Sequence, residues 1–172
     1  MRELSLNVMD IAQNSISAGA SLIEIEVAED IGEDVLKIRV TDNGCGMTPE
    51  QVQHVIDPFY TTRTTRSVGL GVPLFKMEAE MTGGSFEISS EKGKGTSLCA
   101  LFKLSSVDMI PLGDIGGTVQ LLITCNPKLD FLFTRSYRGA GEDRREFTLD
   151  TRELRQVLGE DVPLDAPDVV LW

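Results

Sequence analysis

Strict alternation of apolar and charged side chains runs through residues 21–30 (SLIEIEVAED) and residues 35–42 (VLKIRVTD). The apolar members are Ile23, Ile25, Val27, Leu36, Ile38 and Val40. A period of two is typical of a strand with one face buried and the other in water. The acidic, glycine-containing connection EDIGED predicts a β-hairpin, with glutamates of the first strand facing basic residues of the second on the solvent side.

A helix is predicted before this hairpin, over residues 3–18, because the segment has apolar residues at helical spacing and contains no proline or glycine. It ends at Gly19. Asn7, Asp10 and Asn14 share one face of that helix.

The residues after the hairpin predict two more helices and two more strands. Thr48 as N-cap, followed by Pro49 and Gln51, predicts a short helix that reaches residue 56. Residues 57–71 have the composition of a mobile loop, and residues 72–84 predict a helix with Pro73 near its start. Residues 85–90 and 96–104 predict strands joined by the turn EKGKG.

Residues 1–104 are therefore expected to form an α/β sandwich, in which helices cover one face of a mixed or antiparallel sheet. Residues 105–172 differ in texture and predict a helix, a hairpin and a second helix with Asp150 as N-cap. We expect this segment to be a smaller α+β appendage that packs on the first domain or contacts a protein partner.

Composition narrows the classes of function. The net charge of -11 argues against a nucleic-acid binder. No apolar run approaches the roughly 20 residues of a membrane-spanning helix, and no signal peptide is evident, so a cytoplasmic protein is expected. Cys45, Cys99 and Cys125 are odd in number and widely spaced, which fits reduced thiols better than disulfides or a zinc site.

The segment DNGCGM, residues 42–47, permits two interpretations. Taken alone, its Asn-Gly step favours an ordinary hairpin turn. Alternatively, the sheet holds Asp42 while Gly44 and Gly46 let a planar ligand approach. A fixed carboxylate at this point can accept a hydrogen bond from an exocyclic amine such as that of adenine. Guanine would present a carbonyl oxygen there, leaving two acceptors unpaired.

Two further segments carry weaker signals. Asp10 and Asn14 lie one helical turn apart, an arrangement that is usually a solvated face but that also suits Mg²⁺ and a water molecule. Gly69 and Gly71 precede a helix N-terminus, where free amides favour phosphate. Arg63 and Arg66, in the threonine-rich loop before them, suit either a flexible linker or a lid over phosphates.

The order of these motifs resembles the GHKL superfamily of ATP-binding domains, which includes sensor histidine kinases, gyrase B subunits, heat-shock chaperones and mismatch-repair ATPases. QNSISAGAS and DNGCGM are most similar to the mismatch-repair branch. DPFYTTR and the segment VGLGVPLFKMEAEMTGGSFEISSEKGKGTS are more similar to the histidine-kinase catalytic domain. The resemblance covers residues 3–104, and the four motifs in this order are highly specific together.

The resemblance implies a Bergerat fold, a mixed sheet under three helices, that binds ATP or ADP with Mg²⁺. It implies that Asn14 holds Mg²⁺ and that Asp42 accepts the adenine amine. The other residues implied to bind the nucleotide are Gly44, Gly46, Phe59 at the lid hinge, Arg63, Arg66, Gly69, Leu70, Gly71 and Thr96. Asp10 takes the position of the general base, where hydrolytic members carry a glutamate whose side chain is one methylene longer.

Two departures bear on activity. Ser67 stands where histidine kinases commonly have a glycine, and no phosphoacceptor-histidine helix precedes residue 3. His54 lies inside the nucleotide domain, in the wrong context for that role. We therefore do not expect conventional autophosphorylation on histidine.

Three functions are consistent with these motifs. The first is a Mg²⁺-dependent protein kinase or signalling ATPase that acts on a separate protein, like the stand-alone anti-sigma-factor kinases. The second is a conformational switch that hydrolyses ATP slowly, with Asp10 as base. The third is a non-catalytic adenine-nucleotide sensor that contacts its partner through residues 105–172. A homodimer is left open, and Cys45 beside the adenine site suggests redox-sensitive binding.

Overall fold

The computed structural model of the chain describes residues 3–59, 70–159 and 161–170. Along the described residues the helices are α1 (Leu4–Ser17), α2 (Pro49–Val55), α3 (Gly71–Met81), α4 (Ile115–Cys125), α5 (Thr151–Leu158) and α6 (Pro167–Val170). The strands are β1 (Leu22–Asp30), β2 (Val35–Asp42), β3 (Ser85–Glu91), β4 (Gly95–Lys103), β5 (Asp130–Arg138) and β6 (Arg144–Asp150).

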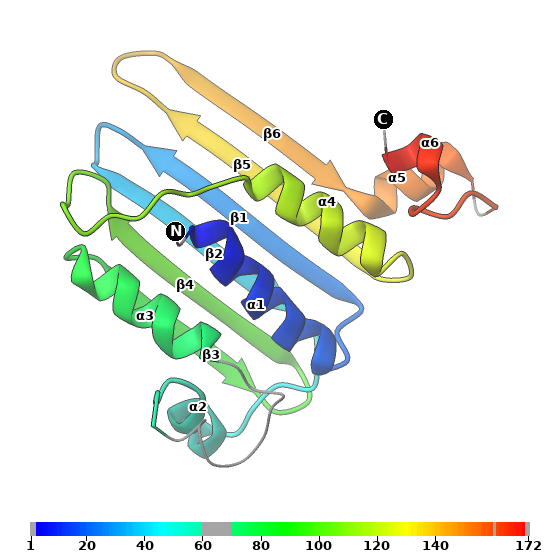
Figure 1. Cartoon of the computed structure of the whole chain (residues 1–172). Coiled ribbons are helices and arrows are strands. Elements are labelled where there is room, and N and C mark those ends of the chain that lie inside the picture. The colour runs from blue at the N-terminus through cyan, green and yellow to red at the C-terminus, as the bar shows by residue number, and fades with distance from the viewer. Residues whose placement is uncertain (1–2, 60–69, 160, 171–172) are drawn as a thin grey trace.

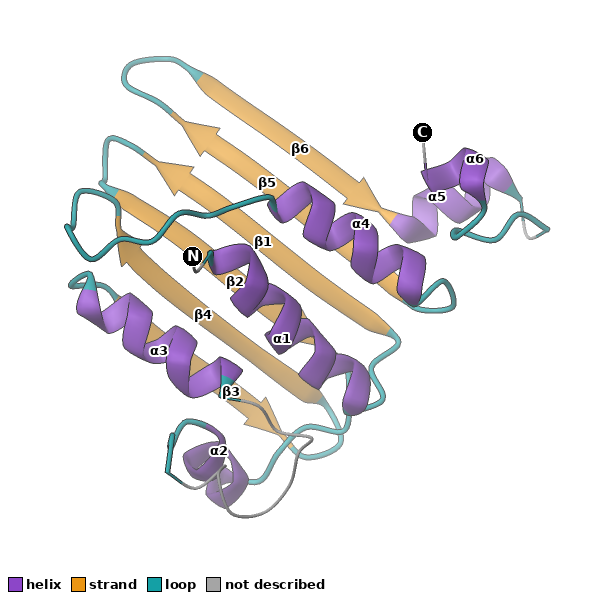
Figure 2. Cartoon of the chain, in the orientation of Figure 1, coloured by secondary structure: helices purple, strands orange, loops and turns teal. Residues whose placement is uncertain are grey.

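The six strands form one mixed sheet in the order β3-β4-β2-β1-β5-β6. Neighbouring strands are antiparallel except for β1 and β5, which are parallel. The α1, α3 and α4 helices lie side by side across one face of this sheet, as Figures 1 and 2 show. The α/β sandwich expected from the sequence is confirmed.

The core lies between the helix layer and the sheet. Ile23, Ile25 and Val27 of β1 are buried on the helix-facing side, as their alternation predicts. Phe75 of α3 packs at 5.4 Å, centroid to centroid, against Phe102 of β4. Burial of such side chains contributes about 1.5–3 kcal/mol each. The opposite face is polar, and there the Lys37 ammonium lies 2.8 Å from the Glu26 carboxylate.

Local sequence signals identify the start of α2 and the end of α1. Thr48 and Gln51 form the predicted capping box of α2, each side chain bonding the other's backbone. Gly19 adopts a left-handed conformation directly after α1. No helix within the described ranges is both long and apolar enough to cross a lipid bilayer.

The segment after residue 104 continues the sheet. Its strand β5 pairs with β1 along the whole length of both strands, from Leu22 opposite Asp130 to Asp30 opposite Arg138. Phe131 and Phe133 of β5 join the same buried core as β1. A domain boundary at residue 104 stays a prediction. The sheet itself is continuous across that residue, because β5 and β6 belong to the same sheet as β1 to β4. Without β5, the hydrogen-bonding edge of β1 would be open.

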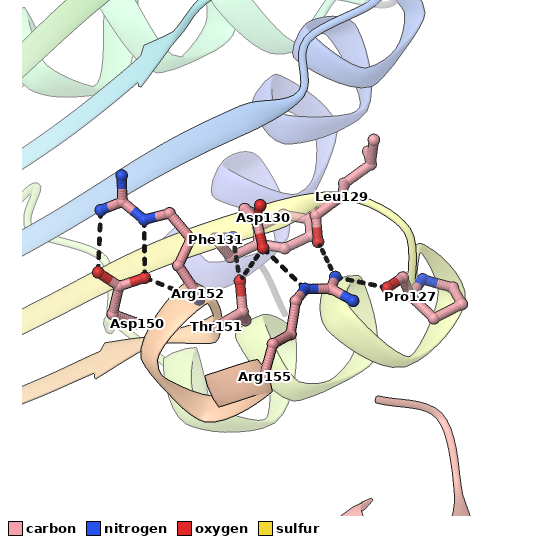
Figure 3. Close-up of polar contacts among 8 residues, drawn as sticks. All are labelled: Pro127, Leu129, Asp130, Phe131, Asp150, Thr151, Arg152 and Arg155. Carbon is pink, nitrogen blue, oxygen red and sulfur yellow. Dashed lines mark hydrogen bonds and ion pairs between the residues drawn. The ribbon is translucent and has the colours of Figure 1, made fainter. Parts of the chain in front are cut away.

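A polar cluster fixes α5 to the start of β5 (Figure 3). Arg155 donates from Nε to the Asp130 carboxylate at 2.9 Å and from Nη2 to the carbonyl oxygens of Pro127 and Leu129. Asp150 caps α5 by accepting from the Arg152 amide, and it also receives two bonds from the Arg152 guanidinium. These guanidinium bonds lower the pKa of the Asp150 carboxyl and raise the pKa of Arg152.

Candidate functional site

A pocket of about 250 Å³ lies where the C-terminal end of α1 faces the DNGCGM loop. Its polar lining consists of Asn14, Ser15, Ser17, Asp42 and Thr96. Its other lining residues are Ile11, Ala18, Val40, Cys45, Gly46, Met47, Val55, Val72, Ile88 and Leu98. Apolar walls with a few fixed polar groups are typical of a small-molecule site.

Asp42 ends β2 and presents its carboxylate to this pocket. Ser15 of α1 donates its hydroxyl to Oδ2 at 2.6 Å, and the Gly44 amide donates to Oδ1 at 2.9 Å. A carboxylate has about four acceptor positions, so these two bonds orient it while leaving capacity for a donor on a ligand. Ser15 was not singled out from the sequence, although it directly follows Asn14.

The loop after Asp42 is anchored rather than free. The Asn43 side-chain oxygen accepts from the amides of Ser21 and Leu22, at 2.8 and 3.0 Å. The Cys45 amide donates to the Ala18 carbonyl at 2.9 Å. The loop is therefore attached to both the end of α1 and the start of β1. It does not form the simple hairpin turn that its Asn-Gly step favours in isolation.

Two glycines are required by close backbone approach. Gly46 has φ +68°, and a Cβ there would lie 1.9 Å from the Glu91 carbonyl oxygen. Gly95 has φ +128°, and a Cβ there would lie 2.0 Å from the Asp42 carbonyl oxygen. The sequence led us to expect that Gly46 gives room to a base. Gly46 lines the pocket, and a side chain at this position is excluded by the Glu91 carbonyl at the end of β3.

Thr96 lies opposite Asp42 in the register of β2 and β4. Its hydroxyl is 2.8 Å from the Ser90 hydroxyl, which also accepts from the Met47 amide at 2.8 Å. Thr96 thus lines the pocket and belongs to a hydrogen-bond chain that holds the end of the DNGCGM loop. Ser90 is a supporting residue that sequence reasoning missed, since only the β3–β4 pairing brings it there.

Asn14 and Asp10 differ in their placement. Asn14 lines the pocket, whereas Asp10 is exposed one turn earlier on α1 and does not line it. Asp10 lies against the start of α3, because a Cβ on Gly71 would be 3.0 Å from the Asp10 Cβ. Asn7, expected on the same face, is instead buried and donates to the Glu78 carboxylate of α3.

The remaining predicted residues lie outside the pocket lining or outside the described residues. Gly44 is buried beside Ala18, Leu70 is half exposed at the N-cap of α3, and Phe59 is 82% exposed. Arg63, Arg66 and Gly69 lie outside the residues that the structure describes. Among the described residues, no three His, Cys, Asp or Glu side chains are grouped closely enough to hold a metal ion by themselves.

The molecule is an α/β sandwich with a largely apolar pocket at the C-terminal end of its first helix. A family model described as histidine kinase-, DNA gyrase B- and HSP90-like ATPase matches residues 1–106. The chain belongs to this family, as its motifs indicate.

Individual relatives cover different parts of the chain. The sensor protein SrrB of Staphylococcus aureus is 38% identical over 102 residues, which are 56% of this chain and 17% of SrrB. The chain therefore corresponds to a small part of that relative. The crystal structure of the N-terminal domain of a DNA repair protein matches with a TM-score of 0.60 and 15% identity, over 93% of this chain and 58% of that one.

The match to the DNA repair protein structure covers more of this chain than the match to SrrB does. Since it covers 93% of this chain, the similarity in fold continues past residue 106 into the C-terminal part of the sheet. The ADP complex of the Aquifex aeolicus MutL ATPase domain matches with a TM-score of 0.47 and 16% identity, over 88% of this chain and 66% of that one.

Proposed function

We propose that this chain binds Mg²⁺·ATP in the pocket below α1 and acts as a protein kinase or signalling ATPase on a separate protein. The observation that carries the proposal is the Asp42 carboxylate, oriented by Ser15 and Gly44 inside an apolar pocket. An adenine ring fits both features, because its faces are apolar and its exocyclic amine donates a hydrogen bond.

The donor set also suits the rest of the nucleotide. Mg²⁺ usually takes one or two ligands from the protein and the others from phosphates and water. The Asn14 amide oxygen, in the pocket lining, would be such a ligand. The bound nucleotide supplies a transferable γ-phosphoryl group whose charge Mg²⁺ offsets. The residues of this chain would orient the base, exclude water from it and hold the metal.

A second candidate is slow hydrolysis of ATP as a conformational switch. It is supported by the contact between Asp10 and Gly71, which puts an exposed carboxylate beside the N-terminus of α3. Helix N-termini favour phosphate groups, so Asp10 would be near the reacting end of the nucleotide. Its short side chain would bind water as the general base.

The assignment of Asp42 to adenine recognition is tested by calorimetric titration of the chain with ATP and with GTP. Asp42→Asn should weaken ATP binding by about 10- to 100-fold, because a hydrogen bond to a charged group is lost. Asp108→Asn makes the same chemical change at an exposed aspartate outside the pocket and should leave affinity unchanged. Equal ATP affinity in Asp42→Asn and in the unmodified chain would remove the proposed adenine site.

The two activities are separated with γ-labelled ATP and Mg²⁺, using the chain alone and with candidate partner proteins. Label on a partner supports phosphoryl transfer. Free phosphate that disappears in Asp10→Asn supports hydrolysis. Tight binding with neither product would instead favour the nucleotide sensor.

A further inference from the structure

The strand β6 forms one edge of the six-stranded sheet, and none of its residues lines the proposed nucleotide pocket. In the described structure β6 pairs only with β5, and its residues from Arg144 to Thr148 are exposed. Figure 1 shows β6 along one side of the sheet, with α5 and α6 past its C-terminal end. An exposed edge presents unpaired backbone groups that can receive another strand.

The pairing of β5 determines which groups of β6 point outwards. The Ile31 amide donates to the Arg138 carbonyl at 2.8 Å, so Arg138 and every second residue before it face β1. The intervening residues of β5 face β6, where their partners are Arg145, Phe147 and Leu149. The alternate residues of β6, including Glu146 and Thr148, therefore direct their N–H and C=O groups to the free edge.

We propose that β6 pairs with β6 of a second copy of this chain, antiparallel and with the two-fold axis at Phe147. Glu146 would then face Thr148 of the partner subunit, with both residues directing their backbone groups across the interface. Each such pair exchanges two hydrogen bonds. The two six-stranded sheets would join into one continuous sheet.

Charge selects this register over its neighbours. With the axis at Phe147, Arg144 faces the partner's Asp150, and Glu146 faces a neutral threonine. An axis at Glu146 would place that carboxylate opposite its own copy, and an axis at Thr148 would place it opposite the partner's Asp150. Like charges directly opposite each other destabilise a strand pair. Because Arg152 already binds Asp150, the pairing of Arg144 with the partner's Asp150 favours this register less than the placement of Glu146 opposite a neutral residue does.

The side chain at the axis supports the same arrangement. Phe147 is 56% exposed on the helix side of the sheet, where it packs edge-on against Phe133. At a non-hydrogen-bonded position the two copies of Phe147 would be in direct contact and bury this apolar surface. The other edge strand, β3, contains Glu87 and Glu91 and no basic residue, so it offers no comparable charge pairing with itself.

The expected association is weak. Seven residues of strand form a smaller contact than the 1,200–2,000 Å² or so of a standard interface, and both copies are strongly acidic. The dimer should therefore depend on concentration and should be measured near 0.15 M salt, where the Debye length is about 8 Å. Sedimentation should show an apparent mass that rises from 18.8 kDa towards twice that value with concentration.

Cysteine crosslinking tests both the surface and its register. Glu146→Cys, Phe147→Cys and Thr148→Cys are made separately in a chain whose Cys45, Cys99 and Cys125 are replaced by serine, and each is oxidised with glutathione disulfide. Only the residue at the axis lies opposite itself, at a Cα separation of about 4.5 Å that a disulfide can span. Phe147→Cys should form a crosslinked dimer at least tenfold faster than the other two variants.

Several outcomes would overturn the proposal. Faster crosslinking at residue 146 or residue 148 would exclude the register. A mass of 18.8 kDa at every concentration up to about 1 mM, with equal slow crosslinking at all three positions, would exclude the dimer and leave the edge to a strand of another protein. Thr148→Pro removes an outward N–H without touching a bond to β5, so it should abolish the rise in mass while the circular dichroism stays unchanged.

Discussion

The Ser15 hydroxyl is one of the two donors that orient the Asp42 carboxylate in the pocket. Ser15 and Asp42 are 27 positions apart in the chain, yet the Ser15 hydroxyl donates to Asp42 at 2.6 Å. Hydrogen bonds to a carboxylate are shorter and stronger than those between neutral groups. The bond therefore fixes the direction in which Asp42 offers its remaining lone pairs to a ligand.

Ser15→Ala should weaken ATP binding by about 5- to 10-fold without unfolding the protein, since one neutral donor contributes about 1 kcal/mol. Titration calorimetry measures the change. Ser89→Ala, at an exposed position of β3, is the matched control and should bind as the unmodified chain does. A Ser15→Ala protein with unchanged affinity would show that the Gly44 amide alone suffices to orient Asp42.

At the residue level, the sequence predicted those pocket residues that belong to a recognisable motif. Asn14, Asp42, Gly46 and Thr96 were predicted, and all four line the pocket. Ser15, Ser90 and the anchoring role of Asn43 could not be predicted, because each depends on a turn or strand that is distant in the chain. The residues next to Ser15 in α1 and next to Ser90 in β3 form no sequence pattern that indicates these hydrogen bonds.

The connection between β6 and α5 shows how an element can be fixed by electrostatics. Asp150 ends the strand, caps the helix and binds the Arg152 guanidinium through both of its oxygens. The helix itself was predictable from its N-cap residue. The bonds of Arg155 to the Asp130 carboxylate and to two carbonyl groups before β5 were not, because they depend on how β5 and β6 are paired.

Acid should remove the contribution of Asp150 to stability. Its bonds to Arg152 lower its pKa in the folded state below the ordinary value of an aspartate. The contribution is therefore complete above the unfolded pKa and is lost as the pH falls through the folded pKa. Urea unfolding from about pH 6 down to pH 2 should show Asp150→Asn less stable at the upper end and equal to the unmodified chain at the lower end.

The control for this titration is Asp165→Asn, at an exposed position near α6. Its stability should follow that of the unmodified chain throughout the same series. If Asp150→Asn were less stable by a constant amount down to the lowest pH, helix capping or packing, and not the ion pair, would explain the loss.

The parallel pairing of β1 with β5 joins the N-terminal and C-terminal parts of the sheet, and sequence patterns do not reveal it. Alternation located β1 and β2, and a hairpin was predicted within residues 105–172, but a period of two does not say which strands are neighbours. The chain reaches β5 from β4 through α4, and residues 105–172, which contain that helix, were expected to form an appendage. The sheet was predictable strand by strand as far as residue 104, and its continuation was not.

Phe133→Ala tests whether both parts of the chain unfold together. Phe133 is 3% exposed, and its truncation should cost about 3–5 kcal/mol through lost burial and the cavity left behind. Thermal unfolding should stay a single transition, shifted to lower temperature, and the loss of ATP binding should coincide with it. Thr134→Ala, the next residue on the opposite face, should shift the transition far less. Two separate transitions would contradict a single cooperative unit.

The parallel pairing also sets an order of events during synthesis on the ribosome. β1 is synthesised early, but its partner β5 emerges roughly 100 residues later, about 5–20 s at ordinary rates of translation. Throughout that interval one side of β1 has no permanent neighbour. The nascent protein therefore has a period in which a central strand is temporarily an edge, and chaperone contact would matter most then.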